Sequence, residues 1–115
     1  MKNIIHVATL INSPAALTVE QGNLLYTEIA NLLKKNEENI IIDFADIESI
    51  ITPFLNESIG RLYGEFTGEE LNKRLSIINQ PVGTNRKFNM VIRNAKQFYS
   101  NKEEYTKIVK KVLDE

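Results

Sequence analysis

The chain has 115 residues, of which 43% are hydrophobic and 25% are charged, and its formal net charge is −1. This length predicts one domain, residues 1–115, that can bury about two-thirds of its unfolded surface. The absence of Cys excludes disulfides, thiolate metal sites and Cys catalysis, and the overall charge lacks the strongly basic balance of a nucleic-acid-binding domain.

The N-terminal segment combines a strand pattern with a helix pattern. Residues 3–10 (NIIHVATL) are rich in Ile and Val, which predicts a strand. Thr18 then opens a helix, with Gln21 three residues later as its capping-box partner. No apolar run reaches the ~18–20 residues needed to cross a bilayer, and polar residues interrupt the N-terminal stretch. We therefore expect a cytoplasmic protein without a membrane span or a signal peptide.

The middle of the chain predicts a buried strand followed by a helix. Residues 40–42 are three consecutive Ile, and a strand apolar on both faces is usually central in a parallel or mixed sheet. Thr52 is the expected N-cap of the next helix, with Pro53 at its first helical position. Gly68 is expected to end this helix, whose buried stripe is predicted at Leu55, Ile59, Leu62 and Phe66.

The C-terminal part predicts a third strand at residues 75–79 and two helices. The helical patterns cover residues 88–98 and 105–112, and Asn101 and Glu104 have the spacing of a cap and its N3 partner. The resulting order, β-α-β-α-β-α-α, predicts an α/β fold with a mostly parallel sheet.

A carboxylate and a hydroxyl stand at the two ends of one connection. Asp43 ends the buried strand, and Thr52 begins the following helix. The N-terminus of a helix attracts negative charge, and a phosphate on Thr52 would add a charge of about −1.5 to −2 there. The sequence therefore indicates a small contact surface that responds to anions.

Asn56, Gly60 and Gly64 recur every four residues and share one stripe of the predicted helix. Glycine inside a helix costs about 1 kcal/mol relative to Ala, so a close approach of other backbone is the natural compensation. Two interpretations stay open: tight packing within the fold, or a groove for a partner.

Residues 40–63 resemble the core of the STAS superfamily, and more closely its bacterial STAS-like family of unknown function. The matching elements are Ile41-Ile42-Asp43-Phe44, Thr52 and Phe54-Leu55-Asn56-Glu57. The resemblance implies a single small STAS-like α/β domain, with a mixed, mostly parallel sheet and helices packed mainly on one side. It also implies partner switching, in which an ATP-binding anti-sigma kinase phosphorylates a hydroxyl at this helix start and so releases the complex.

From this resemblance we expect a non-catalytic regulatory module that is related to anti-sigma-factor antagonists. Its expected partner is a histidine-kinase-like ATPase or another signalling domain. Thr52 is the candidate phosphosite, with Ile51 where antagonists have an acidic residue and Pro53 where they have a small one. The candidate partner-binding residues are Asp43, Ser49, Thr52, Asn56, Glu57 and Gly60. No catalytic residue, metal or cofactor is expected, and the oligomeric state stays open.

An alternative function rests on the C-terminal segment. Residues 86–115 hold eight of the 14 basic side chains and four of the 15 acidic ones. This imbalance suggests an accessory protein that binds a nucleotide or nucleic acid. Phe98, Tyr99 and Tyr105 fall within the apolar helical stripes, however, which favours core packing over base stacking.

Overall fold

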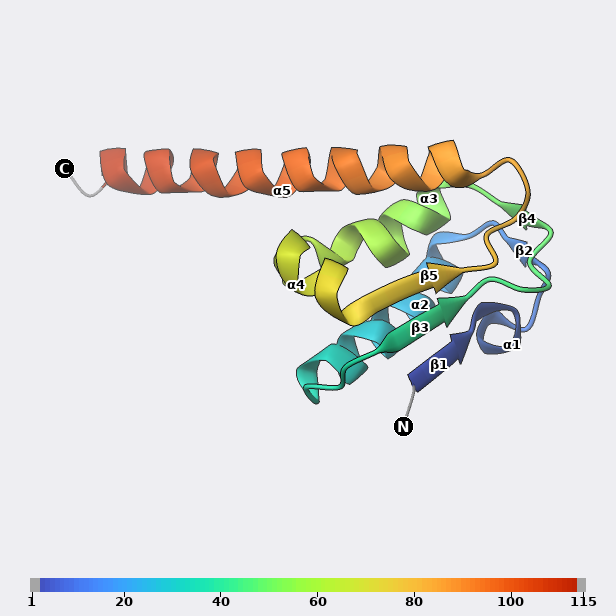
Figure 1. Ribbon diagram of the computed structural model, residues 1–115. Helices are drawn as coiled ribbons and strands as arrows, with labels where there is room; N and C mark the ends of the chain where they lie inside the picture. The colour runs from blue at the N-terminus through green and yellow to red at the C-terminus, as the bar shows by residue number, and fades with distance from the viewer. Residues whose placement is uncertain (1–2, 114–115) are drawn as a thin grey trace.

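The computed structural model describes residues 3–113, with side chains as far as residue 100. The elements, labelled in Figure 1, are β1 (Asn3–His6), α1 (Val7–Ile11), β2 (Ala15–Ala16), α2 (Val19–Lys34), β3 (Ile40–Asp43), β4 (Ser49–Ile50), α3 (Thr52–Leu55), the π-helical segment η1 (Asn56–Gly60), α4 (Gly68–Arg74), β5 (Leu75–Ile78) and α5 (Asn85–Leu113). Within the described residues, no helix combines the length and the apolar character that a membrane span requires.

Three strands form the main sheet in the order β1-β3-β5, and both pairs are parallel. In register, Ile5 lies beside Ile42, and Ile42 beside Ile77. A second, two-stranded parallel sheet joins β2 to β4. The predicted α/β fold with its mostly parallel sheet is confirmed, and β3 is the central strand as expected.

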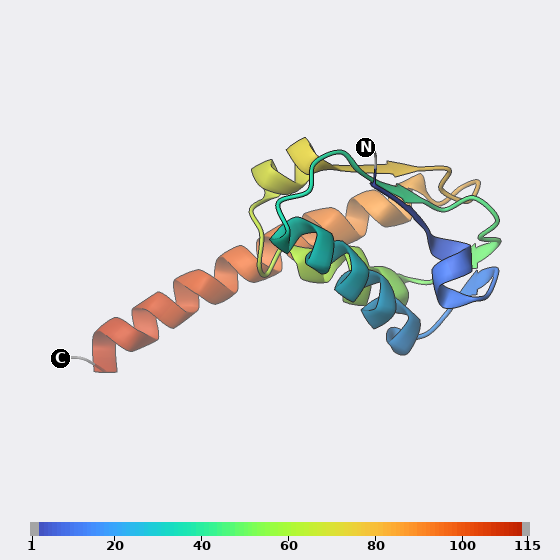
Figure 2. The same ribbon diagram turned by 90° about the horizontal axis from the view of Figure 1, so that it is seen from below.

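The helices cover one face of the main sheet. Figure 2 shows α2, α3 and the first half of α5 on the same side of the strands. On that side Ile40 and Ile42 are fully buried, whereas Ile4 and Ile78 on the other face are 49% and 40% exposed. The expected one-sided packing is therefore confirmed. Ile41 also faces the open side and is only partly buried, so β3 is not covered on both faces.

The first strand is shorter than the sequence predicts. It ends at His6, and Val7–Ile11 form α1, so the prediction of a strand through Leu10 is wrong. Val7 and Ile11 are four residues apart, share one helix face and are both buried. Their burial in the core outweighs the strand preference of Ile and Val.

Helix α2 begins at the predicted capping box. The Thr18 side chain accepts a hydrogen bond from the Gln21 N–H, and the Gln21 side chain accepts one from the Thr18 N–H, both at 3.0 Å. Gly22 then lets α2 approach α3 closely. A Cβ atom on Gly22 would lie 2.8 Å from the Phe54 carbonyl oxygen, so this glycine sets the spacing of the two helices.

Thr52 is the first helical residue of α3, and the N-cap is Ile51. The prediction of Thr52 as N-cap is therefore wrong, and its side chain makes no capping hydrogen bond. The Ile51 N–H donates to the Ala16 carbonyl at 3.1 Å, which extends the β2–β4 pairing and holds Ile51 in an extended conformation. The register of this small sheet thus decides where the helix starts.

The helix continues through η1 to Leu62. Leu55, Ile59 and Leu62 are buried, as predicted, but Phe66, the fourth residue of the predicted stripe, lies beyond the end of the helix and is only partly buried. Ser58 is also fully buried, and its hydroxyl donates to the Phe54 carbonyl at 2.8 Å.

Gly68 begins α4 and does not end the preceding helix, which corrects the prediction for that residue. Thr67 supplies the N-cap of α4, because its side chain accepts a hydrogen bond from the Glu70 N–H.

The C-terminal segment forms one helix, α5, where the sequence predicts two. The expected start of a new helix at Asn101 is wrong, because the helical backbone passes through this residue. A capping pair starts a helix only where the backbone before it is not helical. Because the backbone before Asn101 is already helical, the spacing of Asn101 and Glu104 has no effect. The side chains of the second pattern, residues 105–112, lie outside the described ones.

Candidate partner-binding site

Asp43 joins the ends of all three strands of the main sheet. One carboxylate oxygen accepts hydrogen bonds from the Asn79 side chain and the Ala45 N–H, both at 2.9 Å. The other lies 3.3 Å from Nδ1 of His6, the residue in register with Asp43 on β1. The Asn79 hydrogen bond is the main cause that lowers the pKa of Asp43; the Ala45 N–H and His6 lower it further, while burial raises it.

Replacing Asp43 by Asn is expected to lower the free energy of unfolding by about 1–2 kcal/mol at pH 7, because charge-assisted hydrogen bonds are lost. A lowered pKa in the folded state stabilises the fold above the unfolded pKa of about 3.9, and this contribution is lost as the pH falls through the folded value. The effect of Asp43→Asn should therefore shrink below about pH 4. Denaturant unfolding from pH 7 to pH 3 measures it.

Asp46 offers a matched control, since Asp46→Asn removes the same charge from an exposed residue. Its backbone is left-handed, with φ of 70°, a conformation that Asn also tolerates. This control should change stability little at any pH. An equal loss at every pH for Asp43→Asn would contradict the role assigned to the carboxylate charge.

Thr52 lies partly exposed at the start of α3. Among the described residues, no hydrogen bond involves its hydroxyl. The N–H groups in the first turn of a helix have no intrahelical partners. Because Pro53 has no N–H group, the free backbone donors at this helix start are the N–H groups of Thr52 and Phe54. The Lys87 amine, from the first turn of α5, donates to the Ile50 carbonyl at 2.8 Å. The available hydroxyl thus lies at a helix start, and a cation binds the backbone carbonyl two residues before it.

Asp43 and Thr52 form two separate features of this end of the domain. Asp43 interacts with His6, Ala45 and Asn79, and no hydrogen bond or ion pair among the described residues joins it to Thr52. The connection between them is anchored by the buried side chains of Phe44, Ile47 and Ile50. Asp43 therefore fixes the strand ends, and Thr52 is the more available of the two groups.

The other candidate residues divide by exposure. Ser49, on β4, and Asn56, at the start of η1, are exposed. Glu57 is partly buried, and its carboxylate lies 2.7 Å from the Arg61 guanidinium. Gly60 is buried beneath α5, where an added Cβ would lie 3.4 Å from Val91 and 3.7 Å from Ala95. Gly60 is therefore buried within the domain, and its assignment as a partner contact stays a prediction.

The glycine stripe packs against α5. A Cβ on Gly64 would lie 2.6 Å from the Tyr99 ring, so both glycines of the stripe admit the long helix closely. Of the two interpretations left open by the sequence, tight packing is the one that the structure shows. A cavity of about 320 Å³ remains beside the stripe, lined by Asn56, Gly60, Asn94, Ala95, Phe98 and Tyr99.

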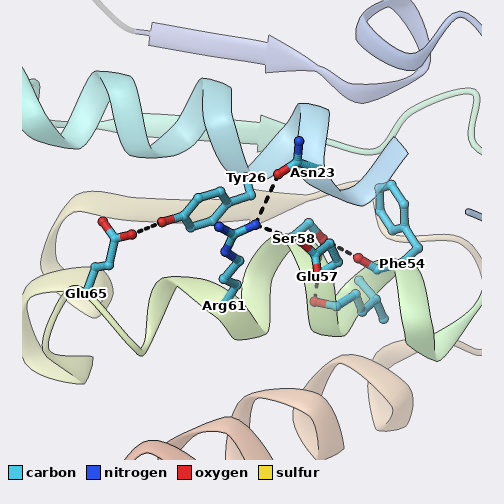
Figure 3. A network of polar contacts seen from close by, with 8 residues as sticks. Asn23, Tyr26, Phe54, Glu57, Ser58, Arg61 and Glu65 are labelled. Atoms are coloured by element: carbon cyan, nitrogen blue, oxygen red, sulfur yellow. Dashed lines mark hydrogen bonds and ion pairs between the residues drawn. The ribbon is translucent and has the colours of Figure 1, made fainter. Parts of the chain in front are cut away.

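A polar network that the sequence analysis missed joins α2 to the helix of α3 and η1 (Figure 3). Arg61 donates to Glu57 at 2.7 Å and to Asn23 at 3.1 Å, and its guanidinium lies 4.1 Å from the centre of the Tyr26 ring. The Tyr26 hydroxyl donates to Glu65. Only the spacing of Glu57 and Arg61, four residues apart, could have indicated part of it.

This network is structural. Burial and the Glu65 hydrogen bond raise the pKa of Tyr26 to about 12, so its hydroxyl keeps its proton at neutral pH. The same hydrogen bond lowers the pKa of Glu65. The network holds the two helices together on the side opposite α5. Among the described residues, no three His, Asp or Glu side chains gather as a metal site would require.

A small parallel sheet with helices on one face, and a partly exposed helix start after its central strand, is consistent with a STAS-like domain. Residues 21–80 match the family described as STAS-like domain of unknown function (DUF4325). This match covers more than half of the chain, so the chain belongs to that family. No curated protein and no solved structure matches the chain.

Proposed function

We propose that this protein is a non-catalytic regulatory module that binds a partner protein through the start of α3 and the adjacent β4. The function resembles that of anti-sigma-factor antagonists, and the proposed partner is a histidine-kinase-like ATPase or another signalling domain. One observation carries the proposal: the Thr52 hydroxyl is partly exposed at a helix start and has no hydrogen-bond partner among the described residues. Exposed Ser49 and Asn56 flank it along the chain.

Phosphorylation of Thr52 would change this surface through local electrostatics. A phosphate charge of about −1.5 to −2 is favoured near free N–H groups at a helix start. The Lys87 amine is held close to this part of the chain by its hydrogen bond to the Ile50 carbonyl. A phosphate would compete with the Ile50 carbonyl for this amine. The contact surface would thus change in charge and in shape while the core stays intact.

Replacing Thr52 by Glu is expected to weaken binding of the partner at least tenfold, because it places a negative charge on the contact surface. Thr52→Val keeps the shape and removes the hydroxyl, and it should bind within about threefold of the wild type. Since Thr52 makes no cap hydrogen bond, Thr52→Val should also change stability by no more than about 0.5 kcal/mol. Calorimetric titration with a partner captured from bacterial lysate measures the affinities.

Incubation with the partner and ATP, followed by mass spectrometry of the Thr52 peptide, tests the modification itself. The expected result is a phosphopeptide from the wild type and none from Thr52→Val. The proposal fails if Thr52→Glu binds the partner as tightly as the wild type does. Circular dichroism of each variant separates loss of binding from loss of fold.

Binding of a nucleotide or nucleic acid through the C-terminal helix draws less support from the contacts. Tyr99 packs against Gly64, and Lys87 is engaged with the Ile50 carbonyl. These two residues are therefore engaged within the domain.

A further inference from the structure

A polar cavity of about 270 Å³ lies between α5 and the loop that leads into α4. Figures 1 and 2 show this loop beside the middle of α5. The loop contributes residues 63–68, and α5 contributes Lys96, Tyr99 and Ser100. Gly64 brings the two walls together, because a Cβ atom there would lie 2.6 Å from the Tyr99 ring. The lining thus combines a cation with hydroxyl groups and aromatic rings.

Lys96 supplies the positive charge of this cavity. Its amine lies 5.8 Å from the centre of the Tyr63 ring, and a Cβ atom on Gly68 would lie 3.9 Å from the amine. Among the residues that the structure describes, no carboxylate lies within ion-pair distance of it. A cation that faces an aromatic ring and has no counter-ion favours a negatively charged ligand.

Glu65 also lines the polar cavity, but its negative charge is compensated by other residues. Its carboxylate accepts a hydrogen bond from the Tyr26 hydroxyl and lies 3.6 Å from the Lys34 amine. Figure 3 shows this carboxylate pointing toward Tyr26 on α2. Glu65 is therefore engaged with α2, and the Lys96 amine is left available to a ligand.

Tyr63 lines a second cavity as well, which has a volume of about 200 Å³ and lies between α4, β5 and α5. The other residues of this lining are Ile59, Leu62, Leu71, Asn72, Leu75, Ile77 and Ile92. Of these only Asn72 is polar, and apolar cavities accept small apolar groups more readily than water. Ile92 and Lys96 are four residues apart, so the two cavities lie along one face of α5.

We propose that the two cavities form one binding site for a medium-chain carboxylate, with its carboxylate group at the Lys96 amine and its hydrocarbon chain in the apolar cavity. One cation matches a group with a single negative charge, whereas a phosphate dianion would need further donors. The aliphatic lining favours a hydrocarbon chain, because burial removes apolar surface from water. Burial also raises the pKa of Tyr63, so its hydroxyl keeps its proton and remains a donor at neutral pH.

Titration of the isotope-labelled full chain with octanoate, followed by NMR, tests this site. Octanoate is expected to bind with a Kd of about 1 mM or lower. The saturable shifts should lie at the backbone amides of residues 63–77 and 92–100. Acetate has the charge without the chain, and octanol has the chain without the charge. Each should bind at least fivefold more weakly than octanoate, because each lacks one half of the recognised chemistry.

Replacement of Lys96 by Gln tests the charge contact. Lys96→Gln should raise the Kd of octanoate at least fivefold, because the side chain keeps its polarity and loses its charge. Lys73→Gln is the matched control: it makes the same substitution at an exposed position on α4 that lines neither cavity. This control should leave the Kd within about twofold. Equal effects of the two substitutions would overturn the proposal.

Replacement of Ile92 by Phe tests the apolar half of the site. The larger ring should fill part of the apolar cavity and weaken octanoate binding at least fivefold, while acetate binding stays the same. Circular dichroism of each variant checks the fold. Since Lys96 is exposed, Lys96→Gln should fold normally and keeps the test decisive if Ile92→Phe does not fold.

Three other outcomes would overturn the proposed site. The first is the absence of saturable shifts up to about 10 mM octanoate. The second is octanol binding as tightly as octanoate. The third is a set of shifts centred on the cavity beside the glycine stripe, at Asn56 and Phe98. The residues around Thr52 line neither of the two cavities, so this proposal and the proposed function can fail separately.

Discussion

Replacing Phe44 by Ala is expected to lower the free energy of unfolding by about 3–5 kcal/mol, the range for removing a large aromatic side chain from a core. Phe44 is fully buried. Its ring meets the edge of Phe88 at a centroid distance of 5.1 Å and an interplanar angle of 81°. This contact packs the start of α5 against the end of β3. Truncation of the Phe44 side chain would leave a cavity between the two elements.

The loss at Phe44 should also reach the proposed contact surface. Lys87 precedes Phe88 in sequence, so a loosened start of α5 weakens the placement of the Lys87 amine at the Ile50 carbonyl. Phe44→Ala is therefore expected to reduce partner binding as well as stability. The more conservative Phe44→Leu should lose less of both. Chemical denaturation of the three proteins measures the stability, and a loss below about 1 kcal/mol for Phe44→Ala would contradict this packing role.

Replacing Arg74 by Ala is expected to cost about 2–4 kcal/mol, because a largely buried cation with four hydrogen bonds is removed. The guanidinium donates twice to the Glu37 carbonyl, at 2.7 and 3.0 Å, and once to the Leu33 carbonyl at 2.9 Å. A fourth bond reaches the Glu70 carboxylate at 2.7 Å. Arg74 therefore closes the end of α2 and ties the turn before β3 to α4.

Two variants separate the geometry of Arg74 from its charge. Arg74→Lys keeps the charge, but its single amine cannot reproduce the planar arrangement of donors, so it should retain only part of the stability. Arg93→Ala removes the same side chain from an exposed position on α5 and should stay within about 0.5 kcal/mol of the wild type. Equal effects of Arg74→Ala and Arg93→Ala on denaturant unfolding would refute the role of Arg74.

The Asp43-Phe44 pair has two roles in the structure. The carboxylate of Asp43 accepts hydrogen bonds that gather the ends of the strands, while the ring of Phe44 anchors the long helix. Together they hold the connection that leads to Thr52. The motif that indicated the family is thus explained mainly by the support it gives to the helix start.

Several features follow from the sequence because their causes are local. The capping box of Thr18 and Gln21 needs only residues three apart, and three consecutive Ile before Asp43 predict the central strand. The buried positions Leu55, Ile59 and Leu62 follow from helical spacing alone. The motif around Asp43 and Thr52 was enough to suggest the family. In each case the interacting groups are neighbours along the chain, so the pattern contains the information.

Tertiary structure decided the features that depend on distant partners. Pairing of Ile51 with Ala16 moved the helix start and left Thr52 without a capping bond. Burial of Val7 and Ile11 turned a predicted strand into α1, and the packing of α5 placed Gly60 inside the domain. Residues far apart in sequence compete for the same backbone and space, and their free energies of burial and hydrogen bonding exceed local preferences.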